Sequence, residues 1–258
     1  RVEISHLKAA GFRSWPKIDA AFSAIESARA KWLRVFSDVY PYEAAFAELG
    51  VILPDEIYGN PDRVNLLKNP AERPRLKKRV QEELDISGSI PEQFMIATVH
   101  RPGNKPMEGK TLAEIAVLQH KEPLDALFDL LADENFLVSA FSFSQDPAVV
   151  KRVAQKDYVS IGSDNMSDFG LKTHPRTFGT FPRFLQWVRD GKTVSLAEGI
   201  RKMTGLPAEV LGFRDRGRLV EGARADIVVF DYAVVGSPAT YEMPAQYPSG
   251  MEFVIVNG

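Results

Sequence analysis

The sequence contains no cysteine, only four histidines, and no apolar run approaching the roughly 20 residues that cross a bilayer. The absence of cysteine excludes disulfide bonds and restricts any metal site within the chain to histidine and carboxylate ligands. The first residues lack the charged-then-apolar pattern of a signal peptide. A net charge of -2 with interspersed signs gives no field that would attract nucleic acid or an anionic membrane. We therefore expect a soluble, cytoplasmic protein with no nucleic-acid or membrane partner.

The composition is that of an ordinary globular protein. The 258 residues are 45% hydrophobic and 26% charged, which is enough to build a sizeable core. The chain begins without methionine, inside the alternating segment 2–7, which is typical of a strand. We interpret it as a piece of a longer protein.

The first part of the chain has the order strand, helix, strand. Ile18, Phe22 and Ile25 stand at helical spacing between the segment 2–7 and a second apolar segment at 33–40. This order favours parallel pairing through a right-handed crossover. Further strands are expected at 136–143 and 158–161, with a helix over 147–155 between them.

Residues 43–135 are irregular and broken repeatedly by proline, which indicates an insertion with its own helices. We expect one helix near 71–84 and another after Thr111, which forms a capping box with Glu114. An insertion that follows the carboxyl end of a strand could cover a barrel mouth as a lid.

The last part of the chain changes from helices to short β-branched runs bounded by glycine. Expected helices near 181–188 and after Ser195 are followed by runs at 216–222, 225–231 and 253–258. We therefore divide the chain into residues 1–211 and a small β domain at 212–258.

Two candidate metal ligands stand at predicted strand ends. Asp164 follows the buried run 158–161, and His6 ends the first strand. A barrel enzyme displays its catalytic groups at the carboxyl ends of its strands, and a neutral imidazole with a carboxylate suits zinc. The alternatives are a structural histidine and an aspartate that caps its own turn.

Arg176 and Lys8 are candidate ligands for a substrate carboxylate. The guanidinium offers a planar fork and the ammonium a point charge. Structural ion pairs are the alternative for both residues. His174 could orient a neighbour or pack beside Pro175, whereas His100 and His120 are not expected to bind metal.

An ordered series of motifs resembles the N-acyl-D-amino-acid deacylases (D-aminoacylases) of the metal-dependent amidohydrolase superfamily. The series covers most of the chain: Ser5-His6-Leu7-Lys8, Asp38-Val39-Tyr40-Pro41-Tyr42, Gly162-Ser163-Asp164, His174-Pro175-Arg176, Gly179-Thr180-Phe181-Pro182-Arg183, Lys202-Met203-Thr204-Gly205, and the closing Val256-Asn257-Gly258. The resemblance implies an α/β fold, namely the C-terminal half of a TIM-type (β/α)8 barrel with an inserted segment and a small β domain.

The resemblance also implies the chemistry. It makes His6 a ligand of one or two zinc ions, and Asp164 both a ligand and the general base that later gives a proton to the leaving amine. Lys8, Tyr40, Arg176 and, less directly, His174 are then substrate-binding residues. The implied reaction is hydrolysis of the linear amide of an N-acyl-D-amino acid.

The chain departs from the family pattern in two respects. Glu43-Ala44-Ala45-Phe46 stands where relatives have a small Gly-Ser-type segment, so the substrate pocket is expected to differ. The remaining zinc ligands of the family have no place here and are expected in a missing N-terminal half, without which we expect an inactive and poorly soluble fragment. A cyclic amidase of the dihydroorotase or hydantoinase type and a non-catalytic amidohydrolase-like module are the alternatives.

Overall fold

The computed structural model describes residues 1–165, 173–191 and 193–258. Its first sheet contains β1 (Val2–Ile4), β2 (Val35–Val39) and β6 (Val159–Ile161) in the order β1-β2-β6. Both pairings are parallel, with Val2 opposite Val35 and Ser37 opposite Val159. The expected strand, helix, strand unit is confirmed. The three strands form an open sheet in the part of the chain that is described, not a closed barrel.

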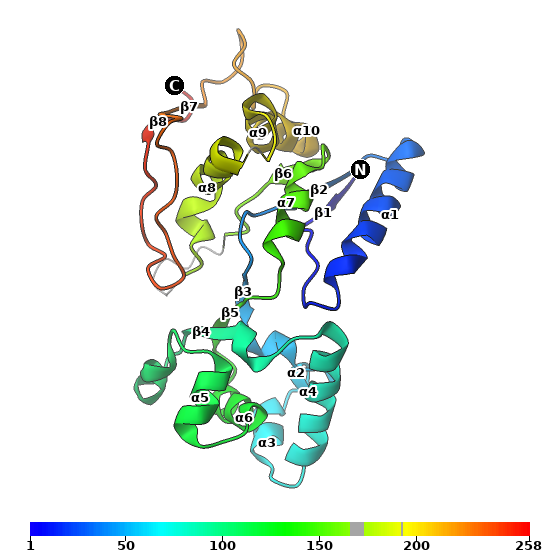
Figure 1. The fold of residues 1–258 in the computed structure, drawn as a ribbon, viewed down its shortest axis with the longest axis vertical. Coiled ribbons are helices and arrows are strands. Elements are labelled where there is room, and N and C mark those ends of the chain that lie inside the picture. The colour runs from blue at the N-terminus through cyan, green and yellow to red at the C-terminus, as the bar shows by residue number, and fades with distance from the viewer. Residues whose placement is uncertain (166–172, 192) are drawn as a thin grey trace.

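Helices pack against this parallel sheet (Figure 1). Helix α1 (Ile18–Ala30) buries Ile18, Phe22 and Ile25, the three residues whose spacing predicted it. The apolar core between sheet and helices also includes residues of the later helices. These are α7 (Pro147–Gln155), α8 (Arg176–Gly191), α9 (Leu196–Met203) and α10 (Gly205–Leu211). Within the described residues, no helix is long and apolar enough to span a bilayer.

The insertion, defined here as residues 45–142, forms a separate lobe beyond the carboxyl ends of β1, β2 and β6 (Figure 1). It has its own apolar core and an antiparallel sheet in the order β3-β5-β4. The capping box is present, because Thr111 Oγ1 accepts from the Glu114 amide and Glu114 Oε2 accepts from the Thr111 amide. The lobe contains β3 (Ala45–Glu48), α2 (Asp55–Tyr58), α3 (Arg63–Lys68), α4 (Arg73–Ser87), β4 (Phe94–Thr98), α5 (Leu112–Gln119), α6 (Pro123–Asp133) and β5 (Ser139–Ser142).

One expected strand pairs differently from its predicted role. The segment 136–143 contains β5, but β5 lies between β3 and β4 in the antiparallel sheet and does not extend the parallel one. Apolar alternation indicates that a segment is extended and does not select its partner. The parallel sheet therefore has no strand between β2 and β6.

The C-terminal part contains an antiparallel pair, β7 (Ile227–Phe230) and β8 (Met251–Ile255). The strand expected at 216–222 was wrong: Gly217 and Gly222 both have a φ of +81°, which turns the chain. Gly217 also packs so tightly that a Cβ atom there would lie 2.7 Å from Ala208 Cβ. The loop between β7 and β8 runs along α8 toward the insertion (Figure 1).

Candidate active site

The parallel sheet brings the predicted site residues to one edge. His6 and Lys8 follow β1, Tyr40 follows β2, and Asp164 follows β6. Because parallel strands end at the same edge of a sheet, these side chains share the rim that faces the insertion. The Lys8 Nζ atom lies 5.5 Å from the centroid of the Tyr40 ring. Arg176, the first residue of α8, places its Cζ atom 4.6 Å from the same centroid.

Arg176 and Asp164 form an ion pair at this rim. The distance from Arg176 Nη1 to Asp164 Oδ2 is 2.9 Å, with side-chain exposures of 2% and 34% respectively. The structural ion pair considered for Arg176 from the sequence is therefore present. Asp164 has a φ of +46°, a left-handed conformation in which aspartate is better tolerated than bulky residues.

This ion pair leaves part of the hydrogen-bonding capacity of the guanidinium unsatisfied within the described residues. Arg176 Nε and Nη1 are buried and make no hydrogen bond of good geometry with the described residues. The buried Tyr40 hydroxyl is in the same situation, although Gln145 and Arg176 lie close enough to influence it. Burial raises the pKa of Tyr40 to about 12, so the hydroxyl keeps its proton and can donate it in a hydrogen bond. Buried donors without acceptors are costly, and a ligand that supplies acceptors removes the cost.

Lys8 adds a second positive charge. Burial lowers its pKa to about 8, and Arg176 acts in the same direction, whereas the carboxylates of Asp164 and Asp38 oppose the shift. Lys8 is therefore still mostly protonated at neutral pH. The rim next to Tyr40 thus has two cationic side chains and one neutral hydroxyl donor.

Asp38, near the end of β2, is a site residue that the sequence did not single out. Its Oδ1 atom accepts a hydrogen bond of 2.8 Å from the His6 amide, and its carbonyl accepts one of 2.9 Å from the Leu7 amide. His6 itself has a φ of +42°, so Asp38 stabilises a turn that would otherwise be strained. A Cβ atom on Gly162 would lie 3.5 Å from Asp38 Oδ1. Desolvation raises the pKa of Asp38, while the His6 amide opposes that shift.

His6 and Asp164 fit zinc in their chemistry but do not form a complete site. Both side chains are accessible at the rim, and imidazole with carboxylate is a common zinc ligand set. Within residues 1–165, 173–191 and 193–258, no group of three or more potential ligands gathers at one point. These two residues could supply part of a zinc site whose other donors lie outside the described residues.

Both ring nitrogens of His174 are already engaged. Nδ1 accepts a hydrogen bond of 2.9 Å from the Arg176 amide, and Nε2 lies 3.0 Å from the Ala44 carbonyl oxygen. The ring is buried, with an exposed fraction of 1%. No nitrogen of His174 is free to contact a substrate in this arrangement.

The other two histidines lie on the insertion. His100 is exposed, and His120 ends α5 with a φ of +53°. Neither belongs to a group of potential metal ligands in the described part of the chain.

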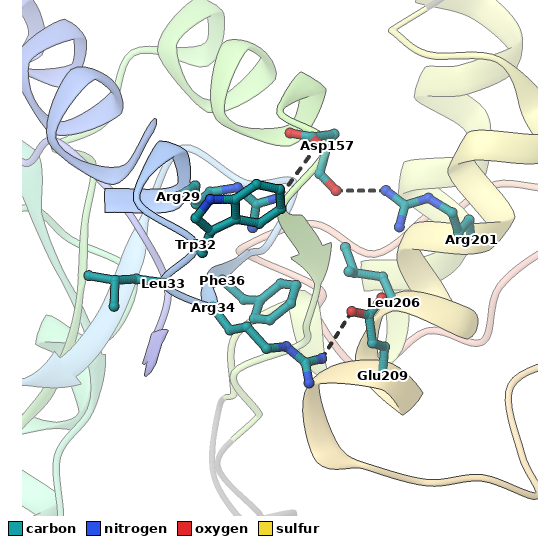
Figure 2. A pocket seen from close by; sticks show the side chains of 9 residues that line it. All are labelled: Arg29, Trp32, Leu33, Arg34, Phe36, Asp157, Arg201, Leu206 and Glu209. Carbon is teal, nitrogen blue, oxygen red and sulfur yellow. Dashed lines mark hydrogen bonds and ion pairs between the residues drawn. The ribbon is translucent and has the colours of Figure 1, made fainter. Parts of the chain in front are cut away.

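A hollow of about 380 Å³ lies at the opposite ends of the strands, around Trp32 and the start of β2 (Figure 2). Its arginines are paired: Arg34 lies 3.0 Å from Glu209, and Arg29 and Arg201 both contact Asp157 (Figure 2). Groups at the amino ends of barrel strands serve stability rather than chemistry. This hollow is therefore not the candidate active site.

The chain is similar to known proteins over most of its length. A family model described as "Amidohydrolase family" matches residues 85–258. An N-acyl-D-glutamate deacylase of Alcaligenes xylosoxydans xylosoxydans is 30% identical over 99% of this chain. A D-aminoacylase from the same organism is 37% identical over 59% of the chain. The match spans 44% of the length of the N-acyl-D-glutamate deacylase. It spans 30% of the length of the D-aminoacylase.

Solved structures agree with the sequence comparison. An N-acyl-D-glutamate deacylase of Bordetella bronchiseptica, complexed with zinc and a phosphonate mimic of the tetrahedral intermediate, matches with a TM-score of 0.77 and 28% identity. A D-aminoacylase structure matches with a TM-score of 0.75 and 29% identity. Each match covers 99% of this chain and 45% of the other. Another similar D-aminoacylase structure has a binuclear metal center, in which one metal activates the enzyme and the second attenuates it. The chain belongs to the amidohydrolase family and is similar to the D-aminoacylases within it.

Proposed function

We propose that this chain is the C-terminal part of a zinc-dependent enzyme that hydrolyses the linear amide of N-acyl-D-amino acids to a carboxylate and a free D-amino acid. The named relatives act on such compounds, and the chain covers less than half of their length. The activity is therefore proposed for the complete protein, in which this chain joins the barrel strands that it lacks.

The observation that carries the proposal is the buried guanidinium of Arg176, whose Nε and Nη1 make no hydrogen bond of good geometry with the described residues. A substrate carboxylate would offer acceptors to Arg176 Nε and Nη1 and to the Tyr40 hydroxyl, which likewise makes no hydrogen bond of good geometry with the described residues, and would attract the nearby Lys8 ammonium. Charge-assisted bonds of this kind are short and directional, so they would fix the amino-acid half of the substrate in one orientation. Desolvation at the rim makes each of them stronger than in water.

Asp164 and His6 would then act on the amide bond of the substrate. His6 and Asp164 would hold the zinc, which when bound polarises a carbonyl and lowers the pKa of a water molecule toward about 7. An oxygen of the Asp164 carboxylate would take the proton of the attacking water and return it to the leaving nitrogen. When the substrate carboxylate engages Arg176, it would supply a second counterion to the guanidinium, and Asp164 would be free for this transfer.

The insertion would act as the lid of this site. It lies beyond the carboxyl ends of the parallel strands, and its β3 begins five residues after Tyr40. Glu43 begins the segment in which the resemblance leads us to expect small residues, and its Oε2 atom lies 3.6 Å from Arg183 Nη2. A carboxylate at position 43 is thus compatible with an anionic substrate.

A matched pair of substrates tests the proposal. The complete protein should hydrolyse an N-acetyl-D-amino acid with a higher kcat/KM than its carboxamide, which has no negative charge. Arg176→Met should lower kcat/KM for the acid roughly 10- to 100-fold, as expected for loss of a hydrogen bond to a charged group, and leave the carboxamide nearly unchanged. Equal losses for both substrates, or no preference in the unmodified protein, would contradict a carboxylate-binding role for Arg176.

A further inference from the structure

His174 connects two segments that are far apart in the sequence. The Arg176 amide can only donate, so His174 Nδ1 accepts and carries no proton. The Ala44 carbonyl can only accept, so Nε2 carries the proton and donates it. Both bonds therefore require the neutral Nε2–H tautomer.

Aromatic rings fix the orientation of the imidazole. Five rings come from three separate segments, with centroids 5.1 to 6.5 Å from that of His174. Burial lowers the pKa of His174 well below its usual range, which supports the neutral state. The five residues are Tyr40 and Tyr42 after β2, Phe46 on β3, Phe141 on β5 and Tyr241 on the C-terminal loop.

Two other hydrogen bonds join the same two segments as the bonds of His174. The Tyr42 hydroxyl donates to the Pro175 carbonyl over 3.3 Å, and Arg183 Nε donates to the Pro41 carbonyl over 2.7 Å. Residues 41–44, which lead into the insertion, are thus held against the start of α8. Among these contacts, the His174 ring is the one that also bonds the Arg176 backbone.

We propose that His174 is a positioning residue that couples the base of the insertion to Arg176, and so fixes the aim of the guanidinium at the substrate carboxylate. Ala44 immediately precedes β3, so its carbonyl follows any displacement of the insertion. Arg176 begins α8, where the first amides have no partner within the helix, and His174 Nδ1 supplies one. The inference rests on the proposed function for its kinetic readout, because only a carboxylate substrate reports the aim of Arg176.

The test uses His174→Phe in the complete protein, because phenylalanine preserves an aromatic ring and removes both hydrogen bonds. We expect KM for an N-acetyl-D-amino acid to rise roughly 10-fold or more, while kcat for the corresponding carboxamide stays close to that of the unmodified protein. His100→Phe is the matched control, since His100 is exposed on the insertion.

A double-mutant cycle separates positioning from general stability. If His174 acts through Arg176, adding His174→Phe to Arg176→Met should raise KM for the acid no further than Arg176→Met alone. Additive losses, equal losses on acid and carboxamide, or an unchanged KM would overturn the inference. His174→Asn, whose side-chain oxygen can accept from the Arg176 amide, should recover part of the lost affinity and serves if the phenylalanine variant fails to fold.

A spectroscopic measurement remains decisive if the proposed function fails. Nitrogen-15 NMR of the complete protein should find His174 as the neutral Nε2–H tautomer throughout pH 5 to 8. An Nδ1–H tautomer or a titrating ring would refute the positioning role. If the unmodified protein hydrolyses no carboxylate substrate, the proposed function is refuted and this measurement alone tests the linkage.

Discussion

Replacement of Lys202 by methionine should destabilise the strand that leads to Asp164. Lys202 lies on α9 with an exposed fraction of 0%. Its ammonium donates to the carbonyls of Lys156 and Val159, the second over 3.0 Å, and lies 3.6 Å from the Glu198 carboxylate. Val159 is the first residue of β6, so the Lys202 side chain stabilises the start of this strand.

The magnitude follows from those contacts. A hydrogen bond from a charged donor contributes about 1.5–3 kcal/mol, and removing one partner from a buried ionic cluster costs about 3–5 kcal/mol. Methionine fills much of the space of the lysine stem and removes the burden of a buried charge, which offsets part of the loss. We expect Lys202→Met to lower the free energy of unfolding by about 2–4 kcal/mol.

The neighbouring Arg201 provides the control. Its side chain is 39% exposed and pairs with Glu198 at the surface, where such pairs contribute up to about 1 kcal/mol. Urea unfolding of the complete protein and both variants measures the difference through the transition midpoints. If Lys202→Met costs no more than Arg201→Met, the reasoning about Lys202 is refuted.

Two further expectations concern pH and packing. Burial lowers the pKa of Lys202 to about 8, so from pH 8 toward 10 the unfolded state binds more protons and the free energy of unfolding should rise, by at most about 1.4 kcal/mol per pH unit. Above pH 10 the buried Tyr40, whose pKa is raised to about 12, acts in the opposite direction. Urea titrations at several pH values should show a smaller rise in Lys202→Met, with the remainder coming from Lys8, whose pKa is also lowered to about 8. Gly179→Ala should destabilise by about 1–3 kcal/mol, because its Cβ would lie 2.2 Å from Ser237 Oγ. Gly103→Ala, in open space, should leave the melting temperature nearly unchanged, and equal shifts in a thermal melt would argue against the packing explanation.

Local patterns predicted much of the fold. The spacing of Ile18, Phe22 and Ile25 located α1, and the Thr111 capping box located the start of α5. Each signal depends only on residues a few positions apart in the sequence. The pairing of β5 was not predictable in this way, since its partners lie 41 to 48 residues upstream in β4 and 91 to 97 residues upstream in β3. The glycine-bounded run at 216–222 failed because alternation does not reveal a positive φ.

The site was predictable in its residue types but not in its contacts. The positions of His6, Lys8, Tyr40 and Asp164 at one edge follow from strand order, whereas Arg176 reaches Tyr40 from the start of α8. Bonds that join distant segments do not follow from a motif. Asp38 supports the turn at His6 across 32 positions, and His174 reaches Ala44 across 130. The contacts of His174 with Ala44 and Arg176 explain the role of the His174-Pro175-Arg176 motif in the structure.

The most direct test of the proposed function is hydrolysis of paired N-acetyl-D- and N-acetyl-L-amino acids by the complete protein, with its zinc content measured in the same preparations. We predict bound zinc, release of the D-amino acid, loss of activity on chelation with recovery on adding zinc, and no hydrolysis by Asp164→Asn despite normal folding. Zinc binding without turnover of any linear amide would contradict the proposal and favour a cyclic substrate. A folded protein with neither zinc nor activity would favour a non-catalytic relative.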